Sequence, residues 1–153
     1  MLSLDILIGK NSYTLINTIA IVGPESSGKS WLAKELAAFY NEPLSLEYSR
    51  KFLAKKNTNY LQDDLITIAD GQLRNELIAL NKAKRFLISD TSNIDIQVWS
   101  IIKYGSLNPA IKNYNLRKKN TYYILCYPDL PYEKDPLRES PNLKKRIKIF
   151  ETF

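Results

Sequence analysis

The chain has 153 residues, of which 44% are hydrophobic and 25% are charged. These values are ordinary for a soluble globular domain and indicate neither a disordered chain nor a membrane protein, and the length predicts one domain. The formal net charge of +6 comes from 22 basic and 16 acidic residues. This excess is compatible with polyanionic ligands or with a nucleic-acid surface.

The position of the basic residues argues against a nucleic-acid surface. They gather late in the chain, at 112–119 and 144–148, without an interleaved aromatic platform that stacks bases. No apolar stretch approaches the ~20 residues that cross a bilayer, and the start lacks the features of a signal peptide, so we expect a cytoplasmic protein. The absence of histidine excludes a His/Cys metal site, and the single cysteine, Cys126, lies in an apolar run that favours a buried structural thiol.

Strands and helices alternate in the predicted secondary structure, after an unassigned segment at residues 1–16. The run at 18–22 is continuous and β-branched and stops at Gly23, as in a central parallel strand that is buried on both faces. In chain order we predict a strand at 18–22, a helix from about 29 to the residue before Pro43, a strand at 44–47, a helix at 49–56, a loop at 56–59, a helix at 63–82, a strand at 85–90, helical structure at 94–102, a strand at 122–126 and a helix with an apolar stripe of Leu143, Ile147 and Phe150 at 143–153.

The segment at 127–141 separates the last strand from the last helix. It contains four prolines and six charged residues, so we expect an ordered loop or a lid. Strands that alternate with helices at this spacing predict an α/β domain with a parallel sheet of about four strands and helices on both faces. Ligands bind such a sheet at the carboxyl ends of its strands, and every candidate site residue below falls at that edge.

The strongest chemical signal is the octapeptide Gly-Pro-Glu-Ser-Ser-Gly-Lys-Ser at 23–30, between the first strand and the first helix. This is the P-loop pattern, whose glycines let backbone N–H groups surround a phosphate at a helix amino terminus. We expect Lys29 to reach the β and γ phosphates of ATP and Ser30 to contact Mg²⁺, in a P-loop NTPase/kinase-like fold. The residues expected to contact this cofactor are Gly23, Pro24, Glu25, Ser26, Ser27, Gly28, Lys29, Ser30 and Trp31.

Two acidic residues end predicted strands. Asp90 ends the third strand, where P-loop proteins place the acid that handles Mg²⁺ or its water; the alternative is that it caps the helix that begins near Thr91. Glu47 ends the second strand, where a carboxylate could accept the proton of a substrate hydroxyl. The alternative for Glu47 is a structural ion pair with Arg50.

Positive charge follows the proline-rich segment and could neutralise charge that develops on a transferred phosphoryl group. The candidates are Arg138, Lys144, Lys145 and Arg146. We favour Arg138, whereas we expect the lysines on a solvated helix face. Trp99 and Tyr104 are expected to pack in the core or at the rim of the site rather than to clamp a base.

Several motifs occur in an order that is specific to one known family. They are Gly-Pro-Glu-Ser-Ser-Gly-Lys-Ser (23–30), Leu-Ala-x-x-Tyr-Asn (36–41), Glu-Tyr-Ser-Arg (47–50), Asp-Asp-Leu-Ile-Thr-Ile-Ala-Asp-Gly-Gln (63–72), Asp-Thr (90–91), Val-Trp-Ser (98–100), Pro-Asp-Leu-Pro-Tyr-Glu (128–133) and Leu-Arg-Glu-Ser-Pro (137–141). On these motifs the chain resembles the nicotinamide riboside kinase domain of NadR-type proteins and their standalone P-loop relatives.

The resemblance implies transfer of the ATP γ-phosphate to the 5′ hydroxyl of nicotinamide riboside, which gives nicotinamide mononucleotide for NAD salvage. It implies that Asp90 serves the metal or the acceptor hydroxyl and that Arg138 belongs to a lid. Which of Glu47 and Asp90 acts as the base stays open. By motif position, the ATP and Mg²⁺ site is formed by Gly28, Lys29 and Ser30, and the acceptor side by Glu47, Tyr48 and Arg50.

The family continues past Phe153 with another strand and helix. We therefore expect a kinase-like domain at 17–153 that is truncated at its carboxyl end, and an open sheet edge that favours pairing, for example in a homo-oligomer. This end, together with Ser92 where the family commonly shows a second acid, favours an alternative function. In that alternative the protein is an ATP-binding regulatory or interaction module without kinase activity.

Overall fold

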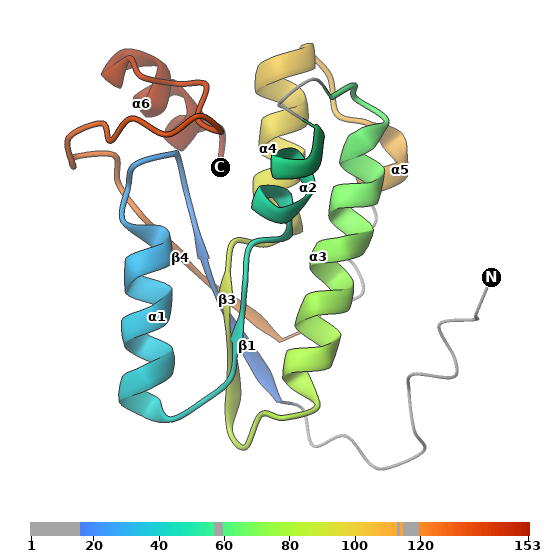
Figure 1. The fold of residues 1–153 in the computed structure, drawn as a ribbon, viewed down its shortest axis with the longest axis vertical. Coiled ribbons are helices and arrows are strands. Elements are labelled where there is room, and N and C mark those ends of the chain that lie inside the picture. Colours follow the sequence, from blue (N-terminus) through green and yellow to red (C-terminus); the bar gives the residue numbers. More distant parts are fainter. Residues whose placement is uncertain (1–15, 57–59, 113, 115–119) are drawn as a thin grey trace.

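Four parallel strands form one sheet in the order β2-β3-β1-β4 in the computed structural model, which describes residues 16–56, 60–112, 114 and 120–153 (Figure 1). β1 is hydrogen bonded on both sides, and its Ile19 lies opposite Ile88 of β3 and Tyr122 of β4. The α/β class with a parallel sheet, as predicted, is confirmed. The strands are β1 (Asn17–Val22), β2 (Leu44–Ser45), β3 (Phe86–Asp90) and β4 (Thr121–Leu125).

Helices cover both faces of this sheet. α1 lies on one face, and α3 lies on the other, on the same side as α2 and α4 (Figure 1). Their bounds agree with the predicted helices to within a few residues, except that α5 has no predicted counterpart. The helices are α1 (Lys29–Tyr40), α2 (Tyr48–Lys56), α3 (Asp64–Leu80), α4 (Asn93–Tyr104), α5 (Pro109–Lys112) and α6 (Leu143–Thr152).

Some predictions fall on residues that the structure does not describe. These are the unassigned segment up to residue 15, the loop at 57–59 and most of the basic cluster at 112–119. Within the described part, β2 is shorter than the predicted strand at 44–47, so Glu47 lies beyond the strand rather than at its last position. No helix of this part is both long enough and apolar enough to cross a membrane.

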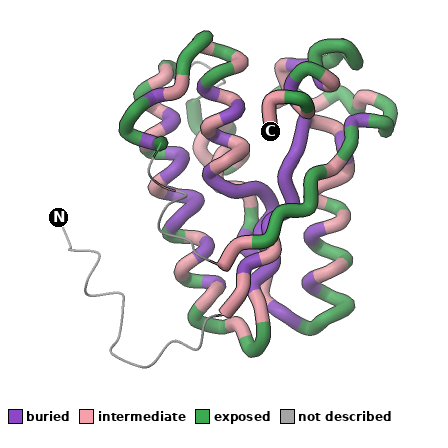
Figure 2. Tube along the Cα trace, turned by 180° about the vertical axis from the view of Figure 1, so that it is seen from behind, coloured by how far each residue is buried: buried purple, intermediate pink, exposed green. Residues whose placement is uncertain are grey.

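Two apolar clusters hold the helices onto the sheet. Between α1 and the strands, Ile21 and Ile88 are fully buried against Ala33 and Ala37. On the opposite side, α3, α4 and α5 share a second cluster of Leu65, Ile68, Ala69, Ile96 and Ile111 with Tyr60. Figure 2 shows the buried central strands between helices with exposed outer faces. The prediction of a central strand buried on both faces is confirmed for β1, since Ala20 and Ile21 have no exposed surface.

β4 is an edge strand whose side chains stay largely accessible. Tyr122 is 63% exposed, and Ile124 and Leu125 are also exposed. Cys126, which follows the strand, was predicted to be buried, but it is only half-buried. The reason is the strand order, because β4 has a neighbour on one side only among the described strands.

The apolar stripe predicted for α6 is only partly buried. Ile147 and Phe150 are half-buried and Leu143 is half exposed, whereas the fully buried residues of the helix are Arg146 and Ile149. The Arg146 guanidinium is directed inward because it donates hydrogen bonds to the carbonyl oxygens of Ser26 and Leu130, at 3.3 and 3.1 Å. Carbonyl acceptors thus allow a cation at a position where pattern reasoning expects an apolar side chain.

Candidate active site

The P-loop joins the carboxyl end of β1 to α1 through two glycines with positive φ. Gly23 has φ +135°, and a Cβ at this position would lie 2.7 Å from the carbonyl oxygen of Cys126. Gly28 has φ +81° and directly precedes α1, whose Leu32 N–H bonds to the Gly28 carbonyl at 2.9 Å. At Gly23, only glycine combines a positive φ with so close an approach of another backbone segment. The backbone N–H groups that begin α1 are thereby available to an anion.

Lys29 lies inside this loop. Its ammonium donates to the carbonyl oxygen of Pro24 at 2.6 Å, and the Ser27 hydroxyl donates to the same oxygen at 2.8 Å. Burial raises the pKa values of Asp90 and Asp95, and the positive charge of Lys29 opposes this rise in both. Lys29 is therefore the positive charge at the centre of the site.

Two cavities open beside the loop. The first, called the P-loop cavity, has a volume of about 350 Å³ and is lined by the loop from Glu25 to Trp31 and by Arg50 and Arg138. The second, called the apolar cavity, has a volume of about 130 Å³. The two cavities share part of their lining, which includes the cation Lys29 and the carboxylates Glu25 and Glu47, together with Ser49, Leu53 and Leu137. The side chains of the apolar cavity that matter below are Tyr60, Leu65, Ile68, Val98 and Trp99.

Asp90 ends β3 next to the P-loop serine that was expected to contact Mg²⁺. Burial raises the Asp90 pKa above its ordinary value, whereas the nearby Ser30 hydroxyl and the charge of Lys29 lower it. Asp90 Oδ1 is buried without a hydrogen-bond partner among the described residues, so an acceptor oxygen is left for a further ligand.

Capping of α4 by Asp90, the alternative role, is wrong. The cap is Ser92, whose hydroxyl accepts from the Ile94 N–H at 3.2 Å, while Asp95 accepts from the Ser92 N–H at 2.9 Å. This reciprocal capping box satisfies the start of α4 without Asp90. The Asp90 carboxylate is therefore not needed to cap α4.

The donor set at Ser30 and Asp90 fits Mg²⁺. A hydroxyl and a carboxylate oxygen are ligands of the kind that this ion prefers, and Mg²⁺ commonly takes its other ligands from substrate phosphates and water. Within the described part of the chain, no group of three or more acidic, cysteine or histidine side chains could hold a metal by itself.

Glu47 is held at the wall that the two cavities share by its neighbours in α2. Arg50 Nε lies 3.3 Å from Glu47 Oε2, so the predicted ion pair is confirmed. The Ser49 hydroxyl donates to Glu47 Oε1. The pairing does not remove Glu47 from the site, because its side chain is a quarter exposed and lines both cavities.

α3 positions the start of α2 through a glycine and a glutamine. A Cβ at Gly71 would lie 2.2 Å from the Tyr48 ring, so this ring packs directly on the α3 backbone. Gln72 Oε1 accepts from the Tyr48 N–H at 2.9 Å, and Gln72 Nε2 donates to Ser89 at 3.4 Å. Tyr48, which was predicted on the acceptor side, is thus packed against α3 next to Glu47.

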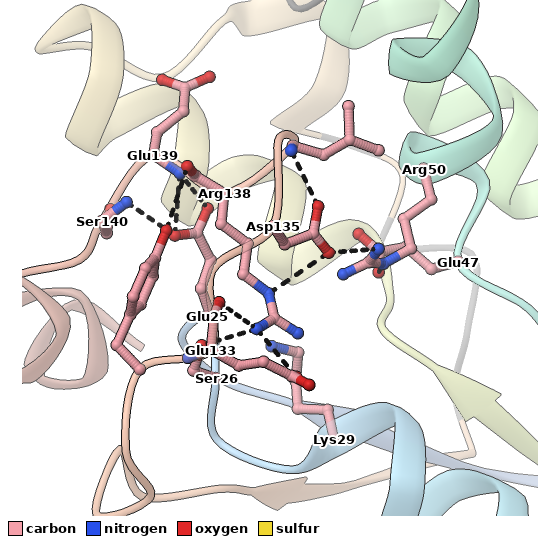
Figure 3. A network of polar contacts seen from close by, with 12 residues as sticks. Glu25, Ser26, Lys29, Glu47, Arg50, Glu133, Asp135, Arg138, Glu139 and Ser140 are labelled. Atoms are coloured by element: carbon pink, nitrogen blue, oxygen red, sulfur yellow. Dashed lines mark hydrogen bonds and ion pairs between the residues drawn. The ribbon is translucent and has the colours of Figure 1, made fainter.

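The segment at 126–142 lies over the P-loop and is called the lid below (Figures 1 and 3). Arg138 Nη1 donates to the Ser26 hydroxyl at 2.9 Å and to the Glu133 carbonyl at 2.8 Å. Arg138 Nε lies 3.7 Å from Asp135 Oδ2. The structure thus brings Arg138 to the P-loop cavity, whereas Lys144 and Lys145 are exposed on α6, as expected.

Sequence reasoning missed Asp95. Its Oδ1 accepts from the N–H of Gly23 at 3.1 Å, and burial raises its pKa to about 7. The signal that could have found it is the spacing Ser92-x-x-Asp95, which is typical of a helix start. Trp99 was assigned to packing, and it does pack against the second apolar cluster, but its ring also lines the apolar cavity, where its indole N–H donates to the Tyr60 hydroxyl.

Comparison with known proteins shows which family the chain belongs to and which proteins it is similar to. The model of family AAA_28, described as an AAA domain, matches residues 18–153. The chain belongs to this AAA domain family. The expected likeness to NadR-type proteins is also confirmed, by relatives in sequence and in structure.

The relatives are longer than this chain. The chain is 28% identical over 127 residues to the trifunctional NAD biosynthesis/regulator protein NadR of Escherichia coli (strain K12). The aligned residues make up 80% of this chain and 31% of that protein. The crystal structure of a NadR protein in complex with NAD and AMP-PNP has a TM-score of 0.62 at 18% identity over 72% of the chain, and that of a NadR protein in complex with NR has a TM-score of 0.66 at 20% identity over the same share. The chain spans 34% and 33% of these structures, so it corresponds to about a third of each relative.

Proposed function

We propose that this AAA domain protein is a kinase that transfers the γ-phosphate of ATP to the 5′ hydroxyl of nicotinamide riboside and forms nicotinamide mononucleotide. The observation that carries the proposal is that the P-loop cavity and the apolar cavity share a wall that includes Lys29 and Glu47. A phosphate donor and an uncharged ring can be held on either side of this wall. The complexes of NadR proteins with AMP-PNP and with NR support the two ligand classes.

The P-loop side would bind the triphosphate. Backbone N–H groups of the loop surround the phosphates, and Lys29 moves from the Pro24 carbonyl to the β and γ phosphates. Ser30 and Asp90 would hold Mg²⁺, which supplies positive charge against the phosphate oxygens when bound. Arg138, at the P-loop cavity, neutralises charge on the transferred group.

The acceptor side would place a hydroxyl at Glu47. Of the two carboxylates expected to act as the base, Glu47 lines both cavities, whereas Asp90 is only 4% exposed. We therefore assign proton acceptance to Glu47 and metal binding to Asp90. The walls formed by Trp99 and Tyr60 suit a planar aromatic ring such as the nicotinamide group.

Incubation with ATP, Mg²⁺ and nicotinamide riboside tests this function, with the mononucleotide measured by chromatography and mass spectrometry. Lys29→Ala should abolish product, and Lys34→Ala, which removes an exposed lysine five residues further along α1, should not. Full activity of Lys29→Ala would contradict the assignment. ATP binding without product would instead support a regulatory or interaction module.

Three further statements are proposals of the same kind. Residues 17–153 form one kinase-like domain, the protein acts in the cytoplasm, and two or more chains associate. Size-exclusion chromatography with light scattering measures the last of these directly.

A further inference from the structure

Glu25 occupies a position of the P-loop octapeptide where nucleotide binding requires no particular side chain. Its carboxylate accepts backbone hydrogen bonds from the lid, from the N–H of Glu139 at 3.0 and 3.1 Å and from the N–H of Ser140 at 2.8 Å (Figure 3). A negative charge in a loop that binds polyanions opposes nucleotide binding. The contacts with the lid give this charge a different role.

Ser26, the next P-loop residue, faces the lid as well. Its hydroxyl accepts from Arg138 Nη1 at 2.9 Å and from the Glu133 N–H at 3.3 Å. Its carbonyl oxygen accepts from the buried Arg146 at 3.3 Å. Two consecutive P-loop residues, Glu25 and Ser26, therefore bind the lid between its residues 133 and 140.

We propose that Glu25 is a positioning residue, which anchors Glu139 and Ser140 to the P-loop and thereby holds the Arg138 guanidinium at the P-loop cavity. Arg138 directly precedes the two anchored amides, so its backbone cannot leave the loop while the Glu25 contacts persist. Its side chain is only 16% exposed, as expected for a guanidinium held in place. This inference rests on the proposed function for the role of Arg138 in phosphoryl transfer.

Anchoring predicts a specific kinetic pattern. The backbone N–H groups and Lys29 stay in place when Glu25 is replaced, so the affinity for ATP should be retained or improved by the loss of a negative charge. The positive charge of Arg138 would no longer be held where the transferred phosphoryl group develops charge. The loss should therefore fall on kcat and not on the KM for ATP.

Amide hydrogen exchange tests the anchor without any requirement for activity. In Glu25→Ala, the N–H groups of Glu139 and Ser140 should exchange about tenfold faster or more, as measured by NMR, with the midpoint of thermal unfolding unchanged. Glu25→Gln keeps one carbonyl acceptor and should give an intermediate effect. Glu35→Ala, which removes an exposed glutamate of α1, is the matched control. Unchanged exchange of both amides in Glu25→Ala would overturn the anchor.

A double-mutant cycle tests the link to Arg138. We expect Glu25→Ala and Arg138→Ala each to lower kcat by about tenfold or more, and the double variant to be no slower than Arg138→Ala. Independent effects that multiply in the double variant would overturn the positioning role. If the unaltered chain forms no mononucleotide, the proposed function fails, and the exchange measurement still decides whether Glu25 anchors the lid.

Discussion

Arg50 and Asp135 form an ion pair across 85 residues of sequence, with Arg50 Nη1 2.8 Å from Asp135 Oδ2. Arg50 also contacts Glu47, and Asp135 also lies near Arg138 (Figure 3). A continuous series of ion pairs thus links Glu47, which we propose as the base, to Arg138 of the lid. Asp135 joins its two halves, and the hydrogen bond from the Leu137 N–H, together with Arg50, holds the pKa of Asp135 below its usual value.

Asp135→Asn should separate the acceptor side from the lid. The carboxylate that both Arg50 and Arg138 face would be neutral, so each guanidinium would lose its ion pair with Asp135. Among the described residues, Arg50 would keep only its pair with Glu47, and Arg138 only its pair with Glu133. We expect kcat/KM for the acceptor to fall about tenfold in steady-state assays. Asp129→Asn, an exposed aspartate of the same lid, should leave it unchanged. Equal values for both variants would contradict the link.

Substitution of each of the two tryptophans should affect the binding of a different substrate. Trp99 lines the apolar cavity, whereas Trp31 lines the P-loop cavity and is 68% exposed. Trp99→Ala should raise the KM for the acceptor about tenfold or more and change the KM for ATP little, because an aromatic wall is lost. Trp31→Ala should affect only ATP. The reverse pattern, or equal effects on both substrates, would show that the cavities are misassigned.

Gly71→Ala should lower the free energy of unfolding by about 1 to 3 kcal/mol, because the added Cβ would overlap the Tyr48 ring. Urea unfolding measures this change. Gly105→Ala is the control for backbone strain, since Gly105 has φ +73° but no atom within 4 Å of an added Cβ, and the left-handed conformation alone costs about 1 to 2 kcal/mol. Only Gly71→Ala should also raise the KM for the acceptor, because Tyr48 adjoins Glu47. A Gly71→Ala protein as stable as the unaltered chain would contradict the packing.

Asp95 should make stability depend on pH near neutrality. Its folded pKa of about 7 lies above the unfolded value of about 3.9, so the folded state binds the extra proton between these values. The free energy of unfolding should therefore decrease as the pH rises from about 4 to 7, by at most about 4 kcal/mol, and level off above 7. Asp95→Asn should remove this slope from thermal unfolding curves recorded at several pH values. A slope that persists in Asp95→Asn would assign the titration to another group.

The sheet and the P-loop could be predicted because their signals are local. A β-branched run that stops at Gly23 and glycines at fixed spacing require no knowledge of distant residues. α5 was missed because four residues carry no periodicity. Its start does have a local signal, since Asn108 accepts from the Ala110 N–H at 2.9 Å and Pro109 follows at the first helical position.

The contacts of the lid could not be predicted, because they join residues far apart in sequence. Glu25 and Ser140 are separated by 115 positions, and no spacing rule relates them. The inward face of α6 was also unpredictable from pattern, because Arg146 is buried on backbone carbonyl oxygens that the fold supplies. Trp99 could be recognised as a packing residue, but its place on a cavity wall depends on how α4 lies beside the P-loop.

The backbone of Gly23 lies close to that of Cys126, so the reactivity of the Cys126 thiol should respond to ligands in the P-loop. Cys126 is the single cysteine of the chain. Its N–H donates to the Val22 carbonyl at 2.8 Å, so it lies beside the residue at which β1 ends and the P-loop begins. Burial raises the pKa of its thiol, while Lys29 opposes that shift. A phosphate that engages Lys29 would weaken this support for the thiolate and slow its alkylation. Occupancy of the loop could thus be followed by thiol labelling of the unaltered chain.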